Sequence, residues 1–316
     1  MKVVFTGASR FGLCCLGSIR DLPCVDVVGV ITNEQDFKIS YAPQGVSNVL
    51  YANFAEYAKQ HDIACYTMKQ KMNEPGLKTS LEQWQADIMI VVGWYHMVPK
   101  SILNQLPTYG MHASLLPDYS GGAPLVWAII NGEDKTGISL FQFADGVDNG
   151  PLVGQLVTPI TFEDDIKTVY ERIETLGCQL LRENLPLLAS GEAPHQVQDE
   201  SKRRICAQRK PADGMIDWGK TAGEIYNFVR AQTHPYPGAF TTLDDDKVMI
   251  WSAAVCERPA QADEAVGQLI ICDQQLYVVC GDNSLLQLKQ VEFNNEEQAA
   301  WRWYSQLEQK HRGLFV

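Results

Sequence analysis

The stretch DIMIVVG, residues Asp87–Gly93, decides the fold. Its five central residues are all apolar, which is typical of a strand buried on both faces of a parallel sheet. Two earlier runs, Val3–Thr6 and Val25–Thr32, also favour strands, and apolar residues at helical spacing separate them over Phe11–Ile19. Strands that alternate with helices imply right-handed crossovers. The sequence therefore predicts a doubly wound, mostly parallel α/β sheet.

The same patterns continue along the first half of the chain. Gly137–Phe143 alternates like a strand, and the turn formers ADGVDNGP after it predict a hairpin with Leu152–Val157. Helical periodicity then extends over Asp165–Leu188. The other predicted elements are helices at Ala52–Gln60 and Pro124–Ile130 and strands at Ile63–Tyr66 and Tyr109–Ser114.

The composition changes after this long helix. Ala189–Ala212 is polar, contains two prolines and includes the charged stretch SKRRICAQRK, which favours a linker. Short strand-like runs separated by glycine and aspartate follow, as in a small β-barrel. We expect a first domain over 1–190, a linker over 191–211 and a β domain over 212–316, with a helix over Glu296–Arg312 packed on the barrel.

Composition narrows the range of functions. The 316 residues are 46% hydrophobic and 20% charged, as in ordinary globular proteins, and the formal net charge of −12 disfavours a protein that mainly grips phosphate backbones. The N-terminal apolar run is too short for a signal-peptide core or a membrane span. Nine cysteines lack C-x-x-C spacing. We expect a cytoplasmic protein with reduced thiols, no membrane partner and no metal.

Two loops after predicted strands are candidate ligand sites. GASRFG, Gly7–Gly12, joins a strand to a helix, and the side chains of Ser9, Arg10 and Phe11 are candidate substrate contacts. The alternative is a tight turn with no ligand. WYHMV, Trp94–Val98, combines aromatic residues with one polar group at a strand end, which suits a flat heterocycle. Its alternative is a loop that packs back on the sheet.

A histidine in YGMHASLLPDYSGGAP, Tyr109–Pro124, is the candidate catalyst. In an extended strand Gly110, His112 and Ser114 share one face. A lone histidine is often a satisfied core residue. The acidic turn Asp145–Gly150 can instead bring a carboxylate to it from the next hairpin, and a histidine–aspartate pair is suited to proton transfer and to stabilising negative charge.

These motifs together resemble a known family. His112-Ala-Ser-Leu-Leu-Pro117, then Gly121, Pro124, Thr136-Gly137 and Asp148-x-Gly150-Pro151, is similar to the signature of formyltransferases that use 10-formyltetrahydrofolate. RKPADGMIDW from Arg209 and HPYPGAF from His234 resemble the start of the C-terminal domain in the methionyl-tRNA and nucleotide-sugar members. The resemblance implies a Rossmann-like formyltransferase fold over 1–190, followed by an OB-like β-barrel.

The resemblance also implies roles for single residues. His112 maps to the family's catalytic histidine and Asp148 to its aspartate. In the family's chemistry an amine attacks the formyl carbon, the histidine stabilises the resulting oxyanion, and the aspartate orients the imidazole and helps to move protons. Ser114 joins the substrate contacts. The residues expected to contact the folate are Trp94, Tyr95, His96, Met97, Val98, Leu116, Asp145, Gly146 and Val147.

Two positions depart from the family pattern. Members normally carry asparagine two residues before the histidine, to hold the formyl oxygen, and this chain has Gly110. Loss of one such donor typically costs about 10²–10³ in rate. His96, expected at an adjacent strand end, is the favoured replacement donor. The second departure is Ser120, where the family often has arginine.

Three functions remain open. The favoured acceptor is the amino group of a nucleotide-linked sugar, and the alternative is methionyl-tRNA. Members that act on tRNA usually carry a basic insertion after the second strand, whereas TNEQDFKISYAPQGVSN has one lysine, which disfavours nucleic acid. The third reading is a catalytically impaired folate-binding relative, because Gly110 replaces the asparagine. A homodimer is compatible with all three.

Overall fold

The computed structural model describes residues 1–39, 42–261, 264–307 and 314–315, which form two compact units whose segments alternate along the chain. The segments of the first unit are Met1–Gly121, Gly137–Thr158 and Glu171–Ile205, and those of the second are Gly122–Thr136, Pro159–Tyr170 and Cys206–Val316.

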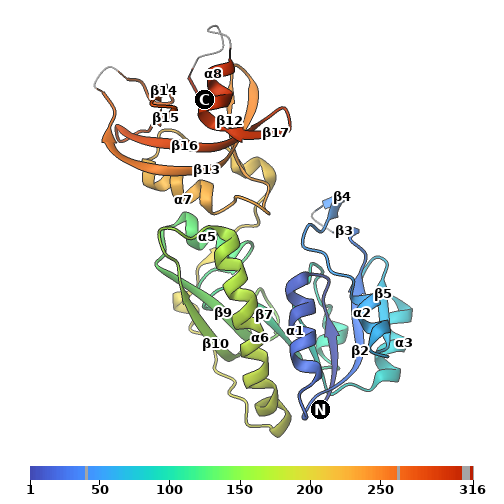
Figure 1. Cartoon of the computed structure of the whole chain (residues 1–316). Helices are drawn as coiled ribbons and strands as arrows, with labels where there is room; N and C mark the ends of the chain where they lie inside the picture. Colours follow the sequence, from blue (N-terminus) through green and yellow to red (C-terminus); the bar gives the residue numbers. More distant parts are fainter. Residues whose placement is uncertain (40–41, 262–263, 308–313, 316) are drawn as a thin grey trace. The chain divides into compact units, whose positions relative to one another are not determined.

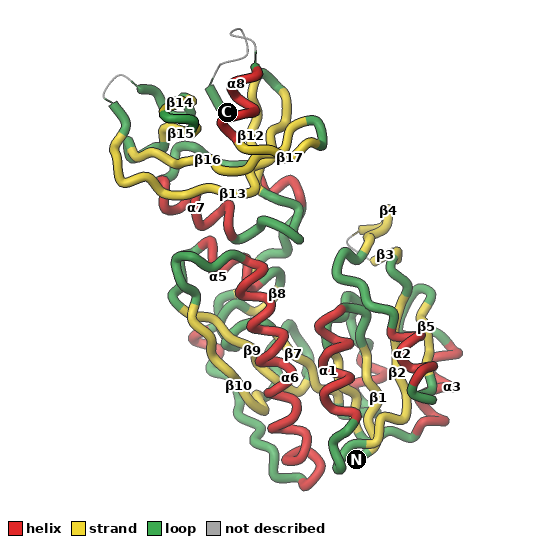
Figure 2. Tube along the Cα trace, viewed as in Figure 1, coloured by secondary structure: helices red, strands yellow, loops and turns green. Residues whose placement is uncertain are grey.

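A seven-stranded sheet forms the centre of the first unit (Figures 1 and 2). In spatial order its strands are β10 (Leu152–Pro159), β9 (Lys135–Gln142), β7 (Thr108–His112), β6 (Ile88–Val91), β1 (Lys2–Thr6), β2 (Asp26–Asn33) and β5 (Cys65–Met68). The pairings of β1 with β2, β1 with β6, β2 with β5 and β6 with β7 are parallel, whereas β7 and β9 are antiparallel. The predicted doubly wound, mostly parallel sheet is confirmed.

Helices cover both faces of this sheet, as the apolar run of β6 predicts. On one face, Phe5 stacks on Phe54 of α2 (Phe54–Gln60), with ring centroids 6.1 Å apart. On the other face, Val4 belongs to a buried cluster with Leu77 of α3 (Pro75–Trp84) and Ile102 of α4 (Lys100–Leu103). Because successive residues of a strand point to opposite faces, both sides of β1 are buried. All four residues of β6 are buried as well.

Two further helices lie on the Phe5 side of the sheet. A Cβ placed on Gly12 of α1 (Arg10–Arg20) would stand 3.1 Å from the Phe54 ring, so α1 packs beside α2. Phe11, also on α1, abuts Gly177 of the long helix α6 (Ile166–Ser190). The first turn of α1 is thereby fixed between the sheet and α6 (Figure 1).

A short hairpin and a small two-stranded sheet were not predicted. β3 (Asp36–Ile39) and β4 (Ala42–Ser47) pair antiparallel after β2. β8 (Ser120–Gly121) pairs with β11 (Ile205–Cys206). The predicted strand at Ile63–Tyr66 begins two residues later, in β5. β8 and β11 are far apart in the sequence, and β3 and β4 show no clear alternation, so local periodicity reports neither pairing.

The second unit contains an antiparallel sheet, which confirms the predicted carboxy-terminal β domain. Its strands are β12 (Ala239–Leu243), β13 (Asp246–Pro259), β14 (Leu269–Cys272), β15 (Gln275–Val279), β16 (Ser284–Phe293) and β17 (Glu296–Ala299). The buried core of this unit includes Trp218, Ile250 and Leu286. Its helices are α5 (Pro124–Ile130), α7 (Ala222–Arg230) and α8 (Ala300–Gln306), with a 3-10 turn at Pro211–Gly214.

The expected helix over Glu296–Arg312 was wrong at its beginning. Glu296–Ala299 forms strand β17, whose residues pair with β16 from Phe293 back to Gln290, and the helix α8 starts only at Ala300. Strand pairing outweighs the helical spacing here, because it satisfies the backbone of four residues at once. Residues 308–312 of the expected helix lie outside the described residues. Within the described ranges, no helix is long and apolar enough to cross a membrane.

Two glycines of α1 should respond oppositely to alanine substitution. A Cβ on Gly12 would lie 2.6 Å from the Val92 carbonyl oxygen, so Gly12→Ala should lower the free energy of unfolding by about 1–3 kcal/mol. A Cβ on Gly17 would meet only the Tyr57 hydroxyl at 3.5 Å, so Gly17→Ala should raise it by about 0.5–1 kcal/mol. Urea denaturation measures both, and a stabilising Gly12→Ala would contradict the packing of α1 described above.

Candidate active site

The carboxyl ends of three parallel strands place the candidate loops at one edge of the sheet. β1 ends at Thr6, β6 at Val91 and β7 at His112, and these strands are neighbours in the order β7-β6-β1. The loops that leave them carry the candidate residues at Gly7–Gly12 and Trp94–Val98. Ligands of open α/β sheets bind at this edge.

His112 ends β7 with its ring held on both sides. Its Nδ1 atom lies 3.5 Å from Oδ2 of Asp148, and its Nε2 atom lies 2.8 Å from the carbonyl oxygen of Tyr119. The two side chains of the pair are only 12% and 22% exposed. Both ring nitrogens therefore face an acceptor. An imidazolium can donate to both acceptors, whereas a neutral ring has one N–H to give.

Asp148 is held by the backbone of the glycine turn. Its Oδ2 atom accepts a hydrogen bond of 2.8 Å from the Gly121 N–H. The residue itself has φ of +51°, in the left-handed region that aspartate visits more readily than most residues. One carboxylate thus meets both the ring of His112 and the turn that follows it. The carbonyl of Tyr119 and the N–H of Gly121 were missed from the sequence, because backbone groups give no side-chain signal.

The position of the missing asparagine is filled by an aromatic ring. A Cβ on Gly110 would stand 2.2 Å from Cε1 of Phe143, closer than real contacts allow. Gly110 and His112 share one strand face, so the Phe143 ring lies on the face of β7 that carries the catalytic candidate. Any side chain at position 110 requires Phe143 to move.

Some side chains of the loop Trp94–Val98 pack in the core, and others line a cavity. Trp94 packs against the cluster that buries Val98, and its Nε1–H points to Sδ of Met72 at 3.2 Å. Tyr95, His96 and Met97 instead line a cavity of about 930 Å³. The two expectations for this loop, a ligand site and packing against the sheet, therefore each describe part of it.

Aromatic and basic residues surround this cavity. The Phe37 ring on β3 lies 5.2 Å from the Tyr95 ring and 5.3 Å from the His96 ring, centroid to centroid. Other residues that line it are Asp36, Lys38, Lys69, Lys71 and Pro99. His112 and Asp148 are not among the described residues that line it, and no described contact joins His96 to His112.

His96 has an unsatisfied polar atom. Its Nε2 atom is buried and has no hydrogen-bond partner among the described residues. Burial lowers the pKa of His96, and the charge of Glu74 opposes that shift. A buried ring nitrogen without a partner costs free energy unless a ligand or water bonds to it. The cavity wall thus offers a neutral imidazole to a polar ligand.

The predicted substrate contacts on α1 have local roles in the fold. Ser9 caps the helix, with its Oγ accepting from the Gly12 N–H at 3.2 Å, and Phe11 is buried. Arg10 is the exposed member, with a side chain 61% exposed and an ion pair of 3.3 Å to Glu174. Of these three predicted residues, Arg10 alone presents its side chain to solvent.

The remaining predicted residues lie in or near the two turns that come after β7 and β9. Ser114 donates its hydroxyl proton to the Asp118 carbonyl at 2.7 Å, and Leu116 is buried. Asp145 forms an exposed ion pair of 2.9 Å with Lys100, while Val147 is 54% exposed. Between them Gly146 has φ of +117°, a conformation that glycine adopts without strain.

Comparison with known proteins identifies the family. A profile described as "Formyl transferase" matches residues 1–185, and one described as "Formyl transferase, C-terminal domain" matches residues 209–307. The chain belongs to the formyl transferase family. It is 32% identical over 291 residues to a methionyl-tRNA formyltransferase of Citrifermentans bemidjiense, covering 90% of this chain and 87% of that one. The resemblance inferred from the sequence motifs is therefore confirmed.

Solved structures share the formyltransferase fold. The N-formyltransferase from Helicobacter canadensis, in complex with folinic acid and dTDP-3-aminofucose, aligns with a TM-score of 0.64 and 18% identity over 91% of this chain and 98% of that one. HypX from Aquifex aeolicus, in complex with tetrahydrofolic acid, aligns with a TM-score of 0.63 and 15% identity over 96% of this chain and 46% of that one. The chain thus spans about half the length of HypX.

The described part of the chain contains no group of three or more histidine, cysteine, aspartate or glutamate residues that could hold a metal ion. All nine cysteines are free, and Cys14 and Cys65 are exposed.

The close packing of Phe143 against Gly110 predicts that substitutions at these two positions affect stability in a coupled way. Gly110→Asn should destabilise the wild-type protein by about 1–3 kcal/mol through overpacking. The same substitution should cost less in a Phe143→Ala background, where the asparagine has room. A double-mutant cycle of urea denaturation measures the difference, and an equal cost in both backgrounds would contradict it.

The buried ring of His96 predicts a pH dependence of stability. Because its pKa is lowered, the unfolded chain binds a proton at a pH where the folded protein does not, and stability falls as the pH drops below about 6.5. His96→Gln should therefore lose less stability than wild type between neutral pH and pH about 5. Urea denaturation at several pH values tests this, with His61→Gln as a control for the loss of an exposed histidine. Identical pH profiles for wild type and His96→Gln would refute it.

Proposed function

We propose that this formyltransferase moves the formyl group of 10-formyltetrahydrofolate to a primary amine, and that the amine belongs to a nucleotide-linked amino sugar. The observation that carries the transfer chemistry is the pair of His112 and Asp148, 3.5 Å apart at the end of β7. We further propose that residues 1–190 form the catalytic domain, residues 191–211 a linker and residues 212–316 an OB-like β domain.

His112 and Asp148 would divide the proton chemistry. The N–H that His112 directs at the Tyr119 carbonyl is the donor that a formyl oxygen would take over as negative charge develops on it. Asp148 would hold the ring in place, and would receive the proton lost by the attacking amine. The bond from the Gly121 N–H keeps the carboxylate of Asp148 in this position.

The cavity beside Trp94–Val98 fits a folate. Its aromatic wall suits a flat heterocycle, and the unpartnered Nε2 atom of His96 offers a hydrogen bond. Bound folates in the Helicobacter canadensis and Aquifex aeolicus structures support this assignment. The residues that we assign to the folate side are Trp94, Tyr95, His96, Met97, Val98, Leu116, Asp145, Gly146 and Val147.

An anionic small molecule suits the surroundings of the site. Three lysines, Lys38, Lys69 and Lys71, line the cavity and can neutralise the carboxylates of a folate tail or a diphosphate. On the α1 side, the Arg10 side chain is 61% exposed and its ion pair with the largely buried Glu174 is 3.3 Å long, so the guanidinium can also turn to a phosphate in solvent. Ser9, Phe11 and Ser114 complete the proposed acceptor side.

Methionyl-tRNA is the second candidate acceptor. The 32% identity to a methionyl-tRNA formyltransferase over 90% of the chain favours it. The net charge of −12 and the single lysine between residues 32 and 48 oppose it, because each phosphate contact needs a cation. Salt dependence separates the two acceptors: tRNA binding would weaken steeply between low and physiological salt, whereas binding of a nucleotide sugar would weaken much less.

A panel assay tests the proposed reaction. The protein is mixed with 10-formyltetrahydrofolate and either amino-sugar nucleotides or aminoacylated initiator tRNA, and release of tetrahydrofolate is followed. We expect turnover with an amino-sugar nucleotide. Turnover with tRNA alone would select the second candidate. No turnover with any acceptor, together with tight folate binding, would identify the third reading, a catalytically impaired relative.

The catalytic pair is tested by substitution. His112→Ala and Asp148→Asn should each lower kcat by about 10²–10⁴ through loss of proton transfer and charge stabilisation. Circular dichroism and the midpoint of thermal unfolding control for folding. Full activity in well-folded His112→Ala would remove this histidine from the mechanism.

A further inference from the structure

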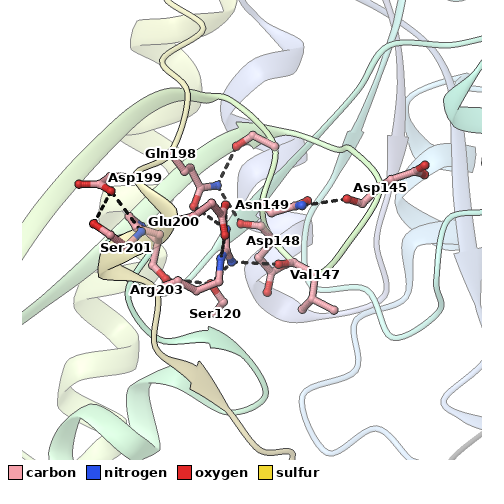
Figure 3. A network of polar contacts seen from close by, with 12 residues as sticks. Ser120, Asp145, Val147, Asp148, Asn149, Gln198, Asp199, Glu200, Ser201 and Arg203 are labelled. Atoms are coloured by element: carbon pink, nitrogen blue, oxygen red, sulfur yellow. Dashed lines mark hydrogen bonds and ion pairs between the residues drawn. The ribbon is translucent and has the colours of Figure 1, made fainter.

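The segment that follows α6 is joined to the catalytic turns by hydrogen bonds. Gln196 exchanges backbone hydrogen bonds of 2.8 and 2.9 Å with Leu152 at the start of β10. Further along, the Ser120 N–H donates to the Arg204 carbonyl at 2.9 Å. Residues 196–204 therefore lie against both turns that carry the site. Two polar side chains of this segment, Gln198 and Arg203, point to the turn that contains Asp148 (Figure 3).

The register of β7 and β9 shows that this turn needs support. Tyr109 lies opposite Gln142, three residues before His112, which is about 10 Å along the strand at roughly 3.3 Å per residue. The turn after β9 thus begins well short of His112, yet Asp148 lies 3.5 Å from the ring. Residues 143–148 must double back over the face of β7. Strand pairing alone does not hold them there.

The Gln198 side chain bonds to both ends of the Asp148–Gly150 stretch. Its side-chain amide donates to the carbonyl of Asp148 at 2.8 Å and to the carbonyl of Gly150 at 2.7 Å. Gln198 is only 5% exposed, so these bonds are shielded from water. The side-chain amide of Asn149 closes the same turn by donating to the Asp145 carbonyl at 2.8 Å.

Arg203 ties this turn to the glycine turn. Its Nη1 atom donates to the Ser120 hydroxyl at 2.6 Å and to the Val147 carbonyl at 3.2 Å, and its Nη2 atom donates to Oε1 of Gln198 at 3.3 Å. Glu200 anchors the guanidinium through an ion pair of 2.6 Å. The Arg203 side chain is 10% exposed. One guanidinium therefore spans Ser120, Val147 and Gln198, all of which Figure 3 shows around it.

We propose that Gln198 and Arg203 are positioning residues that hold Asp148 against His112. This inference rests on the proposed function for its kinetic consequence. Asp148 has φ of +51°, and rotation of its backbone out of that region would displace the carbonyls of Val147 and Asp148. Those carbonyls are the groups that Arg203 and Gln198 bond. Both side chains act through Asp148, and their bonds make its conformation the favoured one.

Arg203 also brings a positive charge to Ser120, one of the two positions that depart from the family pattern. Its guanidinium lies 2.6 Å from the Ser120 hydroxyl. The hydrogen bond to Glu200 raises the pKa of Arg203, and the negative charge of Asp148 adds to that shift.

The test compares three alanine variants of the full-length protein. Gln198→Ala and Arg203→Ala should lower kcat at least tenfold, since small misplacements of a catalytic group cost up to about 10² in rate. The loss in kcat should exceed any rise in the KM for 10-formyltetrahydrofolate, because Arg203 and Gln198 act on Asp148 most directly and reach the folate side only through the backbone of Val147. Lys202→Ala is the matched control, because its 76% exposed side chain pairs only with Asp199 among described partners. Free guanidinium should partly restore Arg203→Ala.

A double-mutant cycle separates positioning from a general loss of folding. If Arg203 acts through Asp148, Arg203→Ala should cost little further activity in an Asp148→Asn background. Losses that multiply independently in the cycle, or full activity in both single variants, would overturn the proposal. A drop in the thermal midpoint with unchanged kcat would also overturn it.

Hydrogen exchange provides a readout that does not need the proposed reaction. Amides of residues 143–150 should exchange faster in Gln198→Ala and Arg203→Ala than in wild type or Lys202→Ala. If the wild-type protein transfers formyl to no acceptor, the proposed function fails, and faster exchange confined to this turn still supports the anchoring. Unchanged exchange in both variants would overturn the anchoring whatever the activity.

Discussion

The doubling back of the turn after β9 over the face of β7 is the constraint on which the site depends. The antiparallel pairing places the end of β9 beside Tyr109, while His112 lies three residues further along β7. Glycine at position 110 leaves room for this turn, because any Cβ there would collide with the ring of Phe143. The glycine that leaves position 110 without a polar side chain therefore also leaves room for Phe143, the first residue of the turn that carries Asp148.

The parts of the fold that were predicted correctly are those encoded in local periodicity. β6 is apolar throughout because helices cover both of its faces, and the helix Pro124–Ile130 has the predicted bounds. His112 was singled out because a titratable residue interrupts an apolar strand, and the acidic turn supplied a partner for it. The signals for β6 and for this helix each lie within a few residues, whereas Asp148 follows His112 by 36 positions and was brought to it by the predicted hairpin.

The parts that were missed depend on strand pairing and backbone geometry that local periodicity does not show. β17 pairs with the end of β16, and β3 pairs with β4 within a stretch that shows no clear alternation. The carbonyl of Tyr119 and the N–H of Gly121 belong to the site through backbone geometry alone. Gln198 and Arg203 lie in a stretch whose polar composition resembles a solvated linker. Their polar side chains instead donate hydrogen bonds to carbonyl groups of the turn that contains Asp148.

Replacement of the family's asparagine by the pair of Gly110 and Phe143 changes the balance of forces at His112. An amide side chain would have offered a hydrogen bond, whereas the Phe143 ring brings apolar atoms to the same face of β7. Apolar surroundings lower the local dielectric, so under the proposed function they would strengthen the attraction between the His112 N–H and the negative charge that develops beside it. The proposed site would thus lose one donor while the remaining one acts more strongly. Such a site tolerates the loss only if Asp148 stays close to the ring, and the side chains that fix its turn then become part of the catalytic design.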